Sequence, residues 1–173
     1  MPKGMFLILS FGLLIISCSY SDQEDSDISR PEMTREVIET DQAPAAIGVY
    51  SQAVRVGNTI YVSGQIGLIP ETGELAGENL DAQVRQTIRN IEAILQAGGF
   101  GLGDVVSAQV FLSDLSDYQA FNEIYVEYFE LNPPARMVVE VSRIPREAKV
   151  EIMVTASQSL LHAQMLEVRR SYP

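Results

Sequence analysis

Residues 133–156 read PPARMVVEVSRIPREAKVEIMVTA, and this stretch decides the fold that the sequence predicts. Polar and apolar side chains alternate on both sides of a short loop, a pattern that indicates two β-strands. If the two strands pair as a hairpin with their apolar rows on one core, Arg136 and Glu151 share the opposite face. The apolar rows are then Met137, Val139 and Val141 in the first strand and Val150, Ile152, Val154 and Ala156 in the second.

Arg136 and Glu151 are the two candidate functional groups of this stretch. A guanidinium binds a carboxylate through paired hydrogen bonds, and a carboxylate on the same face is a candidate general base. The sequence does not fix the register of the hairpin. The two residues are therefore either adjacent or up to about 13 Å apart, which is four residues along a strand.

Length and charge restrict the class of protein. The chain has 173 residues, of which 46% are hydrophobic, so it is long enough for one domain with a full core and additional terminal segments. Its net charge of −11 repels phosphate backbones, and no cluster of lysine and arginine with interleaved aromatic residues offsets it. We therefore expect no binding to nucleic acid.

The N-terminus resembles an export signal. Lys3 precedes the mainly apolar run 5–16, whose length of about 18 Å as a helix is too short for a hydrocarbon core of about 30 Å. Residues 15–18 resemble a bacterial lipobox, which implies a signal peptide at 1–17, a lipidated Cys18 and attachment to a membrane through that lipid alone. The alternative is ordinary cleavage that leaves Cys18 as an incidental thiol. Cys18 is the only cysteine, so the chain forms no internal disulfide.

The mature chain divides into three predicted parts. Residues 18–42 form an acidic tether, because acids outnumber bases by eight to two and large apolar residues are few. The folded domain covers residues 43–157, and residues 158–173 form a tail. Ser19 after the cysteine resembles the outer-membrane address of enteric lipoproteins, so we expect an exported protein on the periplasmic face of that membrane.

The domain is predicted to be α+β, with a mixed sheet covered on one face by two helices. The helix at 79–98 follows from apolar residues at three- to four-residue spacing and from the Gly98-Gly99 stop. The other face of the sheet is then uncovered and must serve as a binding surface, a subunit interface, or both. The remaining predicted elements are strands at 49–56, 59–65 and 105–112, a short extension at 67–69, and a helix from 116 or 117 to 129.

Several kinds of chemistry are unavailable to this chain. His162 in the tail is the only histidine, so no metal site of histidines and cysteines and no cysteine–histidine pair is predicted. The glycines between 98 and 103 follow a helix and lack the spacing of a nucleotide-binding loop. The remaining chemistry uses arginine, carboxylates, hydroxyls, amides, backbone groups and water.

Five blocks of sequence, in this order, resemble the Rid (YjgF-type) imine deaminases. The resemblance covers about residues 43–157 and implies a chorismate-mutase-like fold that forms a homotrimer through the uncovered sheet face, with active sites between subunits. It also implies hydrolysis of 2-imino or enamine acids to 2-keto acids and ammonia, without a cofactor. The blocks are 43–53 (APAAIGVYSQA), 62–66 (VSGQI), 122–125 (NEIY), 134–136 (PAR), and 140–145 (EVSRIP) with 150–152 (VEI).

The resemblance also implies a role for individual residues. Arg136 would hold the substrate carboxylate, and Glu151 would hold or activate the attacking water. Tyr50, Ser63 and Gly64 would line the pocket, Asn122 would support it by hydrogen bonding, and the backbone carbonyl of residue 138 would help to place the water. The chain departs from the family at Val49, where proline is usual, and at Val138, where cysteine is frequent.

Other interpretations of these residues stay open. Arg136 can form a structural ion pair with Glu140 or a trimer contact. Glu151 can be an ordinary exposed strand carboxylate, and Asn122 can simply join a helix to the sheet. Tyr50 can be a packing residue, and residues 63–64 a tight strand end. At the level of function, the alternatives to the deaminase are a module that binds small carboxylates without turnover and a ribonuclease, which export and negative charge disfavour.

Overall fold

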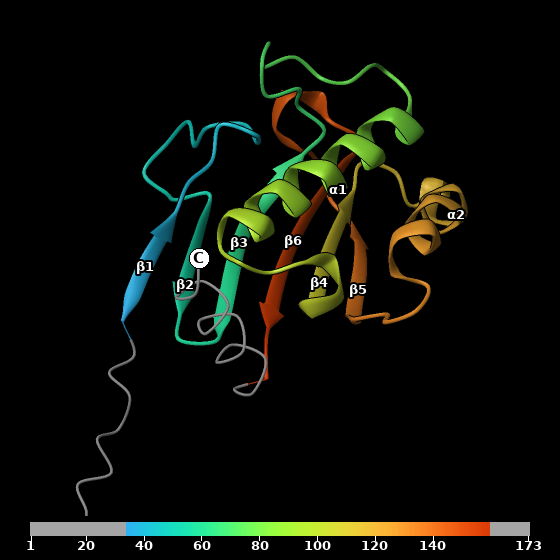
Figure 1. Ribbon diagram of the computed structural model, residues 1–173. Coiled ribbons are helices and arrows are strands. Elements are labelled where there is room, and N and C mark those ends of the chain that lie inside the picture. The colour runs from blue at the N-terminus through green and yellow to red at the C-terminus, as the bar shows by residue number, and fades with distance from the viewer. Residues whose placement is uncertain (1–33, 160–173) are drawn as a thin grey trace, which may run out of the picture. The chain divides into compact units, whose positions relative to one another are not determined.

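The computed structural model describes residues 34–159, and its centre is a six-stranded sheet in the order β1-β2-β3-β6-β4-β5 (Figure 1). Only β4 and β5 are parallel, and every other neighbouring pair is antiparallel. The predicted mixed sheet is therefore confirmed. The strands are β1 (Arg35–Ile38), β2 (Ala53–Val56), β3 (Thr59–Ile66), β4 (Val105–Leu112), β5 (Ala135–Glu140) and β6 (Val150–Ser157).

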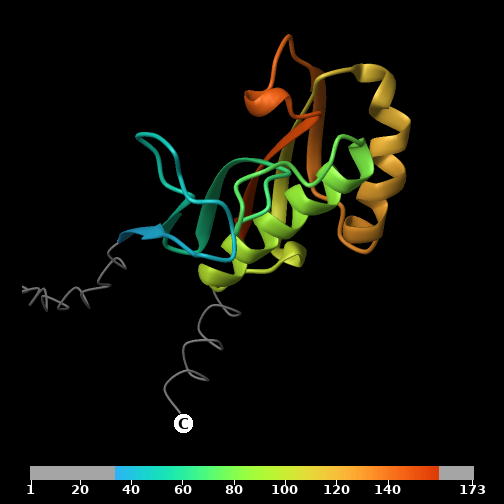
Figure 2. The ribbon, with the colours of Figure 1, turned by 90° about the horizontal axis from the view of Figure 1, so that it is seen from above.

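Two helices, α1 (Leu80–Ala97) and α2 (Tyr118–Phe129), lie on the same face of the sheet (Figures 1 and 2). The side chain of Asn79 caps α1 by accepting a hydrogen bond of 2.8 Å from the backbone of Ala82, and the chain leaves the helix through Gly98. The prediction for α1 is confirmed to within one residue at each end. Short 3₁₀ turns cover Leu102–Asp104, Leu115–Asp117 and Pro145–Glu147.

The core lies between the sheet and the two helices. Alternate residues of β4 and β6 point toward the helices and are almost fully buried, including Val110 and Ile152. Unexpectedly, α1 also buries three polar side chains, Gln83, Thr87 and Asn90. Asn90 donates hydrogen bonds to the carbonyls of residues 66 and 68, so a polar side chain of the helix holds the chain where it leaves β3.

The predicted hairpin of β5 and β6 is wrong. Strand β5 pairs with β4 in parallel, and β6 pairs with β4 from the other side, so that β4 separates the two strands. The helix α2 makes the crossover that a parallel β4–β5 pair requires. The alternation in β5 misled the prediction because both of its rows contain apolar residues. Val138 packs against the core, whereas Met137 on the predicted core row is 44% exposed.

Strand β1 lies inside the segment 18–42 that we predicted as a tether. Its four residues pair with β2 in an antiparallel register, and Ile38 belongs to the buried core. The folded part therefore begins before residue 43. The signal peptide, Cys18 and the tail beyond residue 159 lie outside the described residues. Within residues 34–159, no helix is both long and apolar enough to cross a membrane.

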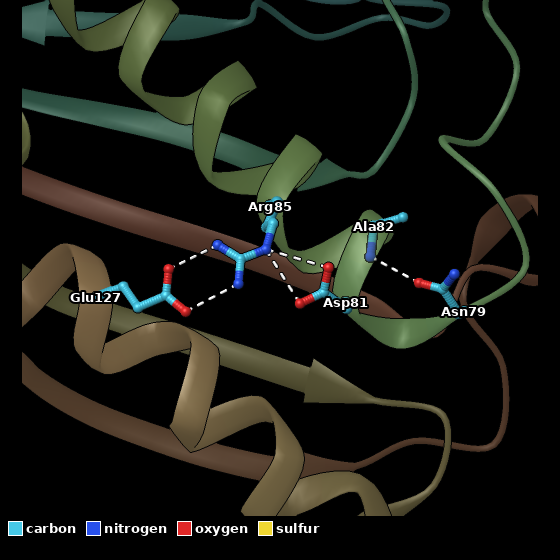
Figure 3. Close-up of polar contacts among 5 residues, drawn as sticks. All are labelled: Asn79, Asp81, Ala82, Arg85 and Glu127. Carbon is cyan, nitrogen blue, oxygen red and sulfur yellow. Dashed lines mark hydrogen bonds and ion pairs between the residues drawn. The ribbon is translucent and has the colours of Figure 1, made fainter.

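An arginine ties the two helices together. Arg85 on α1 donates two hydrogen bonds, of 2.7 and 2.8 Å, to the carboxylate of Glu127 on α2, and it also contacts Asp81 on its own helix (Figure 3). These bonds lower the pKa of Glu127, because they favour its charged form. The pair fixes α2 against α1, which matters because α2 carries candidate site residues.

The face of the sheet opposite the helices is uncovered, as predicted (Figure 2). It exposes several large apolar side chains that come from different strands. Exposed apolar groups spread over one sheet face are typical of a surface that is buried on association. They include Val37, Tyr61, Val106 and Met137.

Candidate active site

The predicted site residues separate into two groups, each beside its own hollow in the surface. The first hollow, of about 430 Å³, is the Glu151 pocket, which lies where β3 and β6 meet the loop before β2. Its lining includes four of the predicted site residues and further residues that we did not predict, among them Gln52, Gln65 and Arg146. The four predicted residues are Tyr50, Ser63, Gly64 and Glu151.

The surroundings of Glu151 in this pocket alter the pKa of its carboxyl group. Its side chain is partly buried, and burial raises the pKa of the carboxyl group because the charged form loses solvation. A carboxylate whose pKa is raised toward neutrality is better suited to take and return a proton. Gly64 makes room for this group, since a Cβ atom at that position would collide with the carboxylate of Glu151.

Hydrogen bonds from two buried glutamines hold the walls of the Glu151 pocket. Gln52 donates to the carbonyls of residues 40, 43 and 44 and so fixes the loop that leads to Tyr50. Gln65 donates to the carbonyls of Ser63 and Gly64, at a break in the register between β3 and β6. The pocket is thus shaped by side chains that satisfy irregular backbone.

Ser63 and Tyr50 are already engaged in hydrogen bonds. The Ser63 hydroxyl donates to the carbonyl of Ser51 at 2.7 Å, and the Tyr50 hydroxyl accepts from the backbone of Ile47 at 3.3 Å. Tyr50 is nevertheless 51% exposed, so it is not part of the buried core. Its hydroxyl proton remains available to a bound molecule.

Substituting Gly64 with alanine is expected to lower kcat/KM for the imine hydrolysis that the resemblance implies. The expected decrease is about ten- to a hundredfold, because the new methyl group displaces the Glu151 carboxylate. The carboxylate is the end of a flexible side chain, so the free energy of unfolding should change by less than about 1 kcal/mol. Urea unfolding and initial rates measure the two effects. Wild-type rates in this variant would contradict the proposed position of the carboxylate.

Gly67→Ala is the matched control. A Cβ atom there would lie 2.7 Å from the backbone of Gln83 on α1, which cannot move aside easily. We expect this variant to lose about 1–3 kcal/mol of stability through overpacking. The two alanine substitutions, three residues apart, therefore separate a local effect on the carboxylate from an effect on the fold.

The second hollow, of about 400 Å³, is the Arg136 hollow, beside β5 and the start of α2. It is lined by Leu115, Tyr118, Arg136 and Val138. The carboxylate of Glu140 accepts a hydrogen bond of 2.8 Å from the backbone of Leu115 and thereby fixes one wall. The hollow therefore combines one cation with apolar side chains, a composition suited to a small organic acid.

Arg136 is held by α2 and not by an acid. Its guanidinium donates a hydrogen bond of 2.7 Å to the side-chain oxygen of Asn122 and lies over the rings of Tyr125 and Phe121. The ion pairs of the described chain do not include Arg136, so the alternative of a structural pair with Glu140 is wrong. Asn122 joins the helix to the strand and supports the arginine at the same time.

Arg136 and Glu151 lie on opposite faces of the sheet, contrary to the prediction that they share one. Arg136 pairs with Ala108, whose side chain is buried beneath the helices. Glu151 pairs with Phe111, and alternation turns both away from the buried row that contains Val110. One chain therefore carries both groups but does not bring them to one small molecule.

Sequence reasoning missed Gln52, Gln65, Leu115, Tyr118 and Arg146. The glutamines were contained in the quoted blocks, but nothing in the sequence marked them as buried. Within residues 34–159, no group of three or more potential metal ligands lies together. A further hollow of about 470 Å³, beside Arg143 and Lys149, contains none of the predicted site residues.

Comparison with known proteins identifies relatives of this chain. Residues 40–158 match the family described as endoribonuclease L-PSP. A RutC family protein of Saccharolobus solfataricus is 50% identical over 125 residues, which are 72% of this chain and 99% of that protein. A mouse protein named 2-iminobutanoate/2-iminopropanoate deaminase is 45% identical over 124 residues, which are 72% of this chain and 92% of that protein.

A solved structure agrees with the fold. The crystal structure of TdcF from E. coli with bound serine superposes with a TM-score of 0.68 at 38% identity and covers 72% of this chain and 99% of that chain. Residues 40–158, which match the family, contain the whole sheet except β1, both helices and both hollows. The chain therefore belongs to the endoribonuclease L-PSP family, which also includes the RutC and Rid proteins.

Proposed function

We propose that this protein hydrolyses 2-imino acids, such as 2-iminopropanoate and 2-iminobutanoate, to 2-keto acids and ammonia. The observation that supports this most is the pair of hollows, one with a carboxylate-binding cation and one with a carboxylate of raised pKa. The 45% identity to a mouse protein named for this activity adds support. So does the serine bound to TdcF, because serine is a small molecule with a carboxylate.

The reaction requires few groups. An iminium carbon is already electrophilic, so water adds to it once the water loses a proton. In the proposed mechanism Arg136 holds the substrate carboxylate, and Glu151 takes the proton from water as its oxygen bonds to C2. Glu151 then returns that proton to nitrogen. As the C–N bond breaks, Glu151 takes the proton of the new hydroxyl group and passes it to the departing ammonia, which leaves as ammonium. The products are one 2-keto acid and one ammonium ion for each iminium acid and water consumed.

The proposal includes a homotrimer, which the resemblance to the Rid proteins implies and in which a complete site takes residues from two chains. Arg136 and Glu151 of one chain face opposite sides of the sheet, so Arg136 of one subunit must meet Glu151 of the next. Three such contacts close a ring in which every subunit contributes both halves. The exposed apolar side chains of the uncovered sheet face would be buried between the subunits.

Ammonia release from 2-iminopropanoate tests the proposed function. The imine is generated in situ by a pyridoxal-phosphate lyase acting on serine, and its hydrolysis with the full-length protein is compared with the spontaneous rate. We expect a rate that rises in proportion to protein concentration. Binding of pyruvate without any acceleration would overturn the enzyme and leave the alternative of a binding module on the same fold.

A ribonuclease function, which the family's description names, has little support in this chain. The net charge is −11, and the two hollows contribute one arginine each against the carboxylate of Glu151. Binding to RNA depends on neutralising phosphates with many cations. The small Arg136 hollow, with its single cation, favours a small organic acid instead.

We also propose that the protein is anchored in the cell envelope by a lipid on Cys18. The support is the apolar run that ends at Ile15-Ile16-Ser17-Cys18, which lies outside the described residues. In cells, Cys18→Ala should abolish labelling by a palmitate analogue and move the protein from the membrane to the soluble fraction. Membrane fractionation that is unchanged by this substitution would rule out the lipid anchor.

A further inference from the structure

The guanidinium of Arg136 rests on an aromatic surface provided by α2. Its central carbon lies 4.6 Å from the centre of the Tyr125 ring and 5.5 Å from that of Phe121. A guanidinium in such contact with a ring face is attracted by the ring's electrons, more strongly where water is excluded. Together with the hydrogen bond to Asn122, the rings define the position and the plane of the cation.

The Tyr125 ring is itself rigidly placed. It is 6% exposed, stacks on Phe129 with ring centres 4.4 Å apart, and lies 5.2 Å from Phe121. Of these three rings, only Phe129 is not in contact with the guanidinium. Phe129 therefore fixes Tyr125 from one side, while Arg136 lies against Tyr125 from another.

The hydroxyl group of Tyr125 does not explain why a tyrosine is placed here. It is buried and has no hydrogen-bond partner in the described part of the chain. Burial raises the pKa of this hydroxyl to about 12, although the charge of Arg136 opposes the shift. The hydroxyl is therefore uncharged near neutral pH. The part of Tyr125 that acts on Arg136 is thus its ring.

We propose that Tyr125 is a positioning residue, whose ring orients the Arg136 guanidinium so that its free N–H groups face an incoming carboxylate. This inference rests on the proposed function. A guanidinium carries five N–H donors in a planar fork, and Asn122 engages only one nitrogen of it. Fixing the fork in advance lowers the entropy lost when a small acid binds, so the ring contributes to affinity without touching the ligand.

Three variants of the full-length protein test this role. Tyr125→Leu removes the ring, Tyr125→Phe removes only the unpartnered hydroxyl, and Phe100→Leu removes a buried ring that contacts a different arginine, Arg55. We expect Tyr125→Leu to raise KM for 2-iminopropanoate and Kd for pyruvate by about three- to tenfold, with a much smaller effect on kcat. Tyr125→Phe and Phe100→Leu should stay within about twofold of the wild type.

A spectroscopic measurement reads the contact directly. The Nε–Hε signal of Arg136, identified by its loss in Arg136→Lys, should be shifted by the ring current of Tyr125. It should move in Tyr125→Leu and stay in place in Tyr125→Phe. This signal does not depend on turnover, so it distinguishes the position of the guanidinium from the activity of the enzyme.

Each outcome decides between the two proposals. Equal KM and Kd values for Tyr125→Leu and Phe100→Leu, or an unmoved Arg136 signal, would overturn the positioning role and leave the deaminase intact. A wild type that binds pyruvate but does not hydrolyse imines would overturn the deaminase. A higher Kd for pyruvate in Tyr125→Leu would in that case still support the positioning role. A wild type that does not bind pyruvate would overturn the positioning role, whatever the signal shows.

Discussion

Arg136→Ala is expected to lower kcat/KM for 2-iminopropanoate by about thirtyfold or more. The substitution removes the cation that binds the substrate carboxylate, and losing one partner of a desolvated charge pair costs about 2–5 kcal/mol. The fold should survive, because Arg136 lies on the edge strand β5 and is only partly buried. Initial rates of ammonia release measure the effect, and circular dichroism checks the fold.

Arg55→Ala is the matched control for this experiment. Arg55 also lies over an aromatic ring, with its guanidinium carbon 5.6 Å from the centre of Phe100, and it donates hydrogen bonds to backbone carbonyls. It lines neither the Glu151 pocket nor the Arg136 hollow. If both arginine variants lose activity to the same extent, Arg136 acts through the fold and the proposed carboxylate site is wrong.

Glu151→Gln is expected to lower kcat by about two to four orders of magnitude, with little change in KM. Glutamine keeps the shape of the side chain and its fit beside Gly64, but it cannot accept the proton of the attacking water. Glu123→Gln serves as the control, because Glu123 is an exposed carboxylate on α2. Retention of wild-type kcat in Glu151→Gln would remove the general base from the mechanism.

The pH dependence of the rate follows from the same carboxylate. The active form is the anion, so kcat/KM should fall as the pH is lowered through the pKa of Glu151, which burial raises above its ordinary value. In the assembled site, the cation of the neighbouring Arg136 would partly counteract that rise. Arg136→Ala should therefore shift the acidic limb of the profile to higher pH, and an unshifted limb would show that the two groups are far apart.

The sequence predicted the elements of this fold better than their pairing. The spacing of apolar residues and the stop at Gly98 located α1, because these signals are local. The partner of β5 was mispredicted because Met137, Val138 and Val139 are all apolar, so alternation did not identify the buried row. Strand pairing depends on contacts that are distant in sequence, which periodicity does not report.

The candidate site was predicted residue by residue but not as a geometry. The strand pattern singled out Arg136 and Glu151, and the resemblance to a family added Tyr50, Ser63, Gly64, Asn122 and Val138. The structure places each of these residues in or beside one of two hollows. Their separation into two groups was missed, because it follows from the position of β4 between β5 and β6. The aromatic support of Arg136 was also missed, since Phe121 and Tyr125 have the spacing of ordinary core residues.

The central claim is that each active site combines Glu151 of one subunit with Arg136 of its neighbour, and subunit mixing tests it most directly. Arg136→Ala and Glu151→Gln chains are each expected to be nearly inactive alone. When they are co-expressed with different tags, trimers that contain both chains can be purified by their two tags. In such trimers some contacts unite an intact Arg136 with an intact Glu151.

In a ring of three, every trimer that contains both chains unites an intact Arg136 with an intact Glu151 at one of its three contacts. We therefore predict that the purified mixed trimers regain about a third of the wild-type rate of ammonia release. A site contained within one chain would always carry one of the two substitutions. Mixed trimers that are no more active than either variant alone would contradict the shared site and the mechanism built on it.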